Sequence, residues 1–422
     1  MSARRFVGLP VGLLALVLGF APLEVAVADA ATVAAATCTS GAVQSAIGSA
    51  RSGDVVTVPA GSCSKWDVTV PDGKRITLEG AGATAIRGGT LDLGRSGSRV
   101  TGFAFAGGFR IDVDGEDWRI DHNTLVGTGP NTEVVLVRST DSTGRQARGL
   151  IDHNTFLNGG RILVAGFGAP SMADAAALAA MNASWAKPTG LGDLERPYVE
   201  DNLFDFSAGT QLSSGAIDVN YGGSFVFRRN SLKNASVEVH SLQQWRASRA
   251  WEIYENAFEG YPGRSWTPGF IRGGTGVAWG NVLVGTWSTP HFVVDVVRAF
   301  EPVGRDYGAC NGKSTADGNE EPNGWPCRDQ LGRGQDVSLS RPSSSTATAR
   351  GWARQSSEPA HFWNNTGVGG ATAGVFVHNN TGGWIRAGRD YILDTPKPGY
   401  TAGRYPHRLA GGASAAASVT RR

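Results

Sequence analysis

Apolar and polar positions recur in a fixed pattern around a series of asparagines in the middle of the chain. The asparagines are Asn123, Asn154, Asn202, Asn230, Asn256 and Asn281. Three positions before them stand Ile120, Ile151, Val199, Phe227, Ile253 and Ala278, and two positions after them stand Leu125, Phe156, Phe204, Leu232, Phe258 and Leu283. Two apolar columns and one polar column, kept over six copies, indicate a repeated structural unit rather than a catalytic motif.

The asparagines are separated by 31, 48, 28, 26 and 25 residues, and each interval is long enough for one turn of a solenoid built from short strands. In parallel stacking, rungs about 4.8 Å apart place the apolar residues inside and let the Asn amides form a hydrogen-bonded ladder at the bend. We also expect each Asn to adopt the left-handed backbone of a sharp corner. A β-propeller or a sandwich would instead require blades of about 40 residues or hairpins with Asn-Gly or Asp-Gly turns, and neither pattern dominates.

The start of the repeat region carries a resemblance to a known family. Residues 40–61, "SGAVQSAIGSARSGDVVTVPAG", predict a short helix, a turn and a first strand, and the helix would cap the open end of the solenoid. This opening, followed by Asn-laddered coils over most of residues 38–300, resembles the pectin-lyase-like right-handed β-helix proteins. The resemblance implies an all-β, right-handed parallel β-helix. Polysaccharide lyases and glycosidases predominate in that family, but a fold alone specifies activity weakly.

The remaining organisation follows from local composition. Residues 1–30 are expected to be a signal peptide, because Arg4 and Arg5 precede an apolar run that ends in "ADA"; a retained membrane anchor is the alternative. Residues 31–409 form one β-helix domain with insertions near 166–195 and 301–357, the first of them Ala-rich and helical. A disordered tail follows at 410–422. We therefore expect a secreted protein, extracellular or periplasmic.

Charge and cysteine content narrow the class of partners. The formal net charge of +2 gives no basis for binding nucleic acid or an anionic membrane, and we expect a monomer. Two short-range disulfides, Cys38–Cys63 and Cys310–Cys327, suit an oxidising compartment, and the spacing does not suit zinc. The segment "TADGNEE" (315–321) offers oxygen ligands for Ca²⁺, but an Asp-Gly-Asn turn inside the disulfide loop is the preferred interpretation. No other metal or cofactor is predicted.

A second strand follows the Asn turn in each coil, and its outward residues predict a site. Strand alternation turns residues 217, 219, 237, 239 and 271 inward. The outward residues on adjacent rungs are Asp218, Asn220, Glu238, His240, Arg272 and Asp295. The residues after His240 bring Trp245, Arg246 and Arg249 nearby. His122 and His153 recur in the turn column, where metal binding is conceivable but a turn role is simpler.

This stripe suits β-elimination of a polysaccharide that contains uronic acid. Arg272 and Arg249 would neutralise the substrate carboxylate, His240 would remove the adjacent proton, and Tyr221 could protonate the leaving oxygen. Asp218, Asn220, Glu238, Trp245, Arg246 and Asp295 would bind substrate. A first alternative is a glycoside hydrolase that uses Asp218, Glu238 and Asp295. A second is a non-catalytic glycan-binding or adhesive β-helix. The stripe lacks Lys and a one-rung Asp cluster for calcium, which departs from the pectate-lyase pattern.

Overall fold

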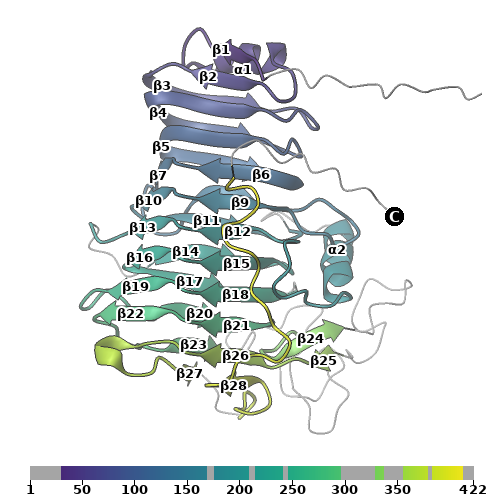
Figure 1. The fold of residues 1–422 in the computed structure, drawn as a ribbon, viewed down its shortest axis with the longest axis vertical. Helices are drawn as coiled ribbons and strands as arrows, with labels where there is room; N and C mark the ends of the chain where they lie inside the picture. The colour runs from purple at the N-terminus through teal and green to yellow at the C-terminus, as the bar shows by residue number, and fades with distance from the viewer. Residues whose placement is uncertain are drawn as a thin grey trace, which may run out of the picture.

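The computed structural model describes residues 30–168, 175–208, 214–240, 246–295, 328–336, 355–378 and 383–411. These residues form a long coil of parallel strands (Figure 1). The all-β parallel β-helix predicted from the repeat is thus confirmed. The predicted signal peptide, the disulfide Cys310–Cys327, the segment 315–321 and almost all of the predicted tail lie outside the described residues.

Each complete coil contributes strands to three faces, defined by the strand pairings. Face 1 contains β2 (Val55–Val58), β6 (Glu116–Asp121), β9 (Arg148–Asp152), β12 (Tyr198–Glu200), β15 (Ser224–Arg228), β18 (Ala250–Tyr254), β21 (Thr275–Trp279), β26 (Ala360–Trp363) and β28 (Tyr391–Leu393). Face 2 contains β7 (Thr124–Val126), β10 (Thr155–Leu157), β13 (Leu203–Asp205), β16 (Ser231–Lys233), β19 (Ala257–Gly260) and β22 (Val282–Gly285). Face 3 contains β8 (Thr132–Val137), β11 (Gly160–Val164), β14 (Ser214–Val219), β17 (Ala235–Val239), β20 (Gly269–Ile271), β23 (Phe292–Asp295) and β27 (Val375–His378).

The first coils use longer strands that continue across the corners. These are β3 (Gly61–Thr69), β4 (Thr77–Asp92) and β5 (Arg99–Val113), and β1 (Thr32–Ala34) pairs with β2. The remaining elements are α1 (Ser40–Ser49), α2 (Ala175–Trp185), a 3-10 turn at Val368–Gly370 and the antiparallel pair β24 (Arg333–Asp336) and β25 (Gln355–Ser357). Neither helix is long and apolar enough to span a membrane among the described residues.

The two apolar columns line the interior as predicted. Ile120 aligns with Ile151 in the strand register, Ile151 aligns with Val199, and Phe227 aligns with Ile253. All of these side chains are fully buried, and so are the members of the second column, such as Phe156 and Phe204, whose rings stack at 4.5 Å. Like side chains in register explain why one pattern repeats from coil to coil.

The asparagines form the predicted ladder at the corner between faces 1 and 2. Asn230 Nδ2 donates to the side-chain oxygen Oδ1 of Asn256 at 3.1 Å, and Asn230 Oδ1 accepts from the Asn202 backbone N–H at 3.0 Å. The same bonds link every neighbour from Asn123 to Asn281, and the ladder continues to Asn365. Stacked amides therefore satisfy the buried backbone of the bend.

The prediction that these asparagines take the left-handed backbone is wrong. The residue before each one has the positive φ, as at His153 (53°), Arg229 (56°) and Glu255 (56°). The buried Asn must keep its amide in line with the ladder, so the exposed corner residue absorbs the bend. This also places the recurring histidines: the rings of His122 and His153 stack at 5.1 Å, and each Nδ1–H donates to the carboxylate of the Asp that precedes it.

The predicted N-terminal helix is α1, which lies beside β1 and β3 at the first end of the coil (Figure 1). Its residues Val43 and Ile47 are fully buried. Its action as a cap stays a prediction.

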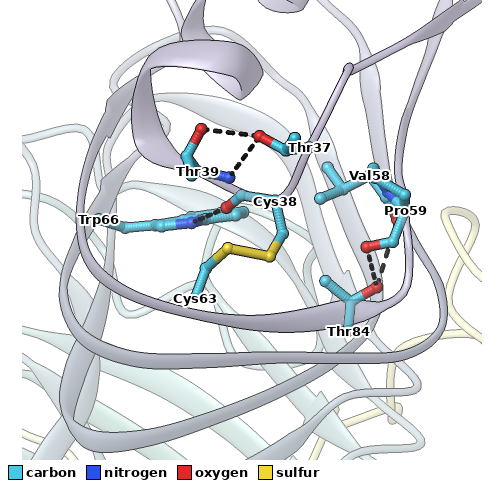
Figure 2. The surroundings of a disulfide bond; sticks show 8 residues. All are labelled: Thr37, Cys38, Thr39, Val58, Pro59, Cys63, Trp66 and Thr84. Carbon is cyan, nitrogen blue, oxygen red and sulfur yellow. Dashed lines mark hydrogen bonds between the residues drawn. A yellow bond between two sulfur atoms is a disulfide. The ribbon is translucent and has the colours of Figure 1, made fainter.

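A disulfide joins Cys38, just before α1, to Cys63 in β3 (Figure 2). The Trp66 indole donates to the Cys38 carbonyl at 2.8 Å on the buried side of this bond. The link attaches the helical segment to the first long strand.

The Ala-rich insertion forms α2, and this helix sets one boundary of the outer surface of face 3. Met181 of α2 packs in one buried cluster with Leu136 and Leu163, the outward residues of β8 and β11. The next residue of that outward column is Asp218. The first polar residue of the stripe therefore follows directly after the part of the face that α2 covers.

Candidate active site

Face 3 aligns the predicted stripe in two outward columns. The register pairs Asp218 with Glu238 and Glu238 with Phe270. The second outward column lies two residues further along each strand. There the His240 N–H donates to the Val219 carbonyl and the Arg272 N–H donates to the Val239 carbonyl, both at 2.8 Å. Asn220, His240 and Arg272 therefore lie on successive rungs. Val219, Val239 and Ile271 point into the core and are fully buried.

Asp218, Glu238, His240 and Arg161 form a polar cluster on this surface. Asp218 Oδ1 lies 2.7 Å from His240 Nδ1, and Asp218 Oδ2 lies 3.0 Å from Arg161 Nη1. Glu238 Oε2 lies 4.0 Å from Arg161 Nη1 and 4.0 Å from His240 Nδ1. The Glu238 and His240 side chains keep 20% and 24% of their surface exposed, against 8% for Asp218. A buried carboxylate thus binds a more accessible histidine, and a second, more accessible carboxylate lies beside it on the next rung.

The cluster separates the pKa values of its two carboxyl groups. Burial raises the pKa of Asp218, but the charge and hydrogen bond of His240, together with Arg161, outweigh burial and lower it overall. Burial is the main cause that raises the pKa of Glu238, and the Asp218 charge adds to it. Burial lowers the pKa of His240, yet Asp218 outweighs it and raises the pKa above its ordinary value. Such a split is typical of sites that hold and move protons.

Tyr221 and Arg272 border the cluster. Tyr221 is 8% exposed and packs with Phe167 under α2. Burial raises the pKa of its phenol, and so do the charges of Asp218 and Glu133, which lie within electrostatic range. Arg272 is half-buried, lies 5.8 Å above the Phe270 ring, and its charge lowers the pKa of His240. Tyr221, just after the rung of Asp218, and Arg272, on the rung after His240, therefore lie on the two rungs that flank the histidine.

The structure places Arg246 and Arg249 away from this surface. Arg246 is fully buried, with three hydrogen bonds to Asp329 at 2.7, 2.9 and 3.2 Å and an ion pair with Asp336 at 3.2 Å. Arg249 is 2% exposed, donates to the Lys187 carbonyl and lies 4.7 Å from the Trp185 ring. Both guanidinium groups support the packing of α2, so we leave them out of the site. Trp245 lies outside the described residues.

Asn220 and Asp295 lie on either side of His240 and Arg272 in the second column. Asn220 is 6% exposed, and its side-chain oxygen has no hydrogen-bond partner among the described residues. Asp295 is 2% exposed, pairs in register with His378 and lies 3.4 Å from that ring. Asp295 thus stands two rungs from His240, on the far side of Arg272.

Sequence reasoning missed Arg161 and Glu133, which lie 3.3 Å apart. Both precede inward residues of earlier strands, so strand alternation extended back along face 3 would have found them. The register shifts between Arg161 and Ile162 and between Gly215 and Ile217 hide this alignment in the sequence. The long Arg161 side chain then crosses to the next rungs, which only the folded chain shows.

The cluster also has the donor types of a cation site. One ligand atom each from Asp218, Glu238 and His240 lie within 4.8 Å of one another. Arg161 already supplies positive charge to the same carboxylates, so the donors fit a bound divalent cation poorly. We assign no metal to this cluster.

Comparison with known proteins adds little to this geometry. No protein-family model matches the chain, and no curated protein matches its sequence. Among solved structures, an alginate lyase from Paenibacillus sp. str. FPU-7 is similar at 13% identity and a TM-score of 0.30, over 66% of this chain and 96% of that one. A likeness this distant carries no argument about activity.

Proposed function

We propose that this protein is a polysaccharide lyase that cleaves a uronic-acid-containing glycan by β-elimination. The observation that carries the proposal is His240, held by Asp218 at 2.7 Å and next to Arg272 on an outer face. The roles of Arg249 and Arg246 considered from sequence are not retained, because both side chains are buried.

The hydrogen bond to Asp218 defines how His240 would act. When the imidazole is neutral and its proton lies on Nδ1, that nitrogen donates to Asp218 and the lone pair is on Nε2. Nε2 would then remove the proton from the carbon that bears the substrate carboxylate. Arg272 would pair with this carboxylate and acidify the C–H bond.

The electrons of that C–H bond form a carbon–carbon double bond, and the glycosidic carbon–oxygen bond breaks. The leaving oxygen takes a proton from the phenol of Tyr221, whose raised pKa keeps it protonated. The products are a new reducing end and an unsaturated uronic sugar. His240 and Tyr221 return to their starting states by exchanging protons with water.

A polysaccharide panel tests the proposal. The mature protein is incubated with polygalacturonate, alginate, glucuronan and a neutral xylan, while ultraviolet absorbance and reducing ends are followed together. Matched gains in absorbance and reducing ends on an acidic polymer support elimination. Parallel assays with EDTA and with added Ca²⁺ test metal dependence, and we expect EDTA to leave the rate unchanged because Arg272 and Arg161 supply the positive charge.

The pH dependence provides a second check on the base. The raised pKa of His240 keeps the ring protonated near and somewhat above its ordinary titration range. The reactive neutral form therefore accumulates only as the pH rises through this raised pKa. We expect kcat/KM to increase with pH over that window; a rate that falls over the same window contradicts His240 as the base.

Hydrolysis is a second candidate, favoured by the carboxyl pair. Glu238 with its raised pKa would be the acid, and Asp218 with its lowered pKa would be the nucleophile or base. Their oxygens lie within 4.8 Å, close to the spacing of about 5 Å in retaining glycosidases. Reducing ends without an absorbance gain would select this candidate. Neither signal, with binding retained, would select a glycan-binding protein.

A further inference from the structure

Beyond His240, aromatic side chains lie beside Arg272 and Asp295 on the outer surface of face 3. The residues are Trp266, which precedes β20, Phe270 in β20, and Phe376 and His378 in β27; we call them the aromatic platform. Trp266 is 37% exposed and Phe376 is 45% exposed. Exposed apolar side chains that gather on one surface mark a binding site more often than isolated exposed ones do.

The aromatic platform continues directly from the polar cluster. Phe270 meets His240 edge-on, with ring centroids 6.0 Å apart, and Trp266 lies 5.2 Å from Phe270. On the other side, Trp266 lies 5.9 Å from His378, which is 6.3 Å from Phe376. The register runs from Glu238 through Phe270 and Val293 to Phe376. The contacts therefore extend over three rung-to-rung spacings, roughly 14 Å at about 4.8 Å each.

We propose that the aromatic platform is a subsite for pyranose rings, and that the glycan lies along the axis of the coil from His240 toward β27. This inference rests on the proposed function for its direction, because the bond to be cleaved must lie at His240. One pyranose unit of an extended chain, about 5 Å, is close in length to the distance of about 4.8 Å between adjacent rungs. Sugars along the axis can thus meet one outward side chain after another.

The chemistry of the surface fits acidic sugars in particular. The axial C–H bonds of a pyranose ring give it an apolar face, which leaves water when it packs on an indole or phenyl ring. Arg272 lies over Phe270 at 5.8 Å and can pair with a carboxylate at the edge of the same sugar. Stacking by the rings and pairing by Arg272 together favour a uronate over a neutral sugar.

Calorimetric titration tests the platform separately from catalysis. The titrations use the full chain with His240→Ala, so that ligand is not consumed, and oligosaccharides of polygalacturonate, alginate, glucuronan and xylan. We expect Trp266→Ala and Phe376→Ala each to raise the Kd of an acidic ligand by about tenfold or more, while Trp266→Phe keeps most of the affinity. Val284→Ala is the matched control, because Val284 is 50% exposed on face 2.

The outcomes separate the two proposals. Circular dichroism and melting temperature first confirm that each variant folds. Unchanged affinity in both Trp266→Ala and Phe376→Ala, or no binding by any glycan, overturns the platform. Binding that depends on Trp266 without cleavage by the wild-type protein supports the platform and removes the lyase activity. Cleavage with affinity independent of both rings removes the platform and keeps the lyase.

Discussion

Faces 1 and 3 both carry charged side chains on adjacent rungs, yet they differ in what covers them. On face 1, the C-terminal segment, residues 394–411, runs back across the strands from β28 toward β9 (Figure 1). Arg228 pairs with Glu200 at 2.6 Å and donates to the carbonyls of Gly403 and Arg404 at 2.7 and 2.9 Å. Glu200 also accepts from the His407 backbone at 3.0 Å.

On face 3, the part of the chain that the structure describes lays no such segment over His240 and Glu238. Their side chains keep a fifth to a quarter of their surface, whereas Glu200 and Arg228 keep none. The charges of Arg228 and Glu200 on face 1 are satisfied by the chain itself, whereas His240 and Glu238 on face 3 keep surface that a ligand can reach. Charged residues in register therefore do not mark a site unless their partners are also known.

Replacement of His240 should produce the largest effect. We expect His240→Ala to lower kcat about 10³-fold, because a positioned base contributes about 10²–10⁴ to a rate, with the fold unchanged. His153→Ala is the matched control, since His153 makes a similar 2.8 Å contact with Asp152 at the turn. Initial rates of ultraviolet absorbance measure both. Near wild-type turnover in His240→Ala would exclude this residue from the mechanism.

Removal of one partner of the face 1 pair should mainly affect stability. Arg228→Met leaves the buried Glu200 carboxylate without its positively charged partner. We expect this to lower the unfolding free energy by about 3–5 kcal/mol. Arg229→Ala, which breaks the exposed pair with Glu255, should cost less than about 1 kcal/mol. Chemical denaturation measures both, and activity below the melting temperature should survive. Equal losses in the two variants would show that the covered pair is not structural.

Acid should weaken the attachment of the C-terminal segment. Burial, with the charges of Arg408 and Arg228, lowers the pKa of His407 to about 4. The His407 ring takes up its proton at a higher pH in the unfolded chain than in the folded one. The folded state therefore has its full unfolding free energy above about pH 6.5, and loses about 3 kcal/mol of it as the pH falls toward 4. His407→Gln should flatten the unfolding free energy over this window. An unchanged pH slope in that variant would assign the effect to other groups.

Interruption of the Asn ladder should have the smallest effect. Asn230→Leu removes the donor to the Val199 and Arg228 carbonyls and orphans buried groups that cost about 1–3 kcal/mol. Ser231→Leu, at the exposed neighbouring position, is the control and should be nearly neutral. Thermal melts compare the two. A Tm of Asn230→Leu equal to wild type would mean that the corner does not depend on the ladder.

The sequence predicted the features that depend on repetition. Ile151, Asn154 and Phe156 recur because identical environments recur on each rung, so their columns and the ladder could be read directly from spacing. Strand alternation likewise placed Asp218, His240 and Arg272 on one outer face. The corner backbone was assigned to Asn instead of the preceding residue, because the pattern shows that a bend exists but not which residue adopts the positive φ.

Residues that break the repeat could not be placed in this way. Arg246 looked like a ligand beside His240, but Asp329, more than eighty positions later in the chain, buries it under α2. Arg161 was not singled out from the sequence, but its side chain reaches Asp218 beyond the insertion at 166–195.

The amino-acid pattern by itself determined the coil, because burying an apolar column and pairing buried amides are local requirements that each rung repeats. Only the tertiary structure decided which charged face is open, because that depends on where α2 and the C-terminal segment come to lie. Those contacts join residues far apart in the chain, and no periodicity encodes them.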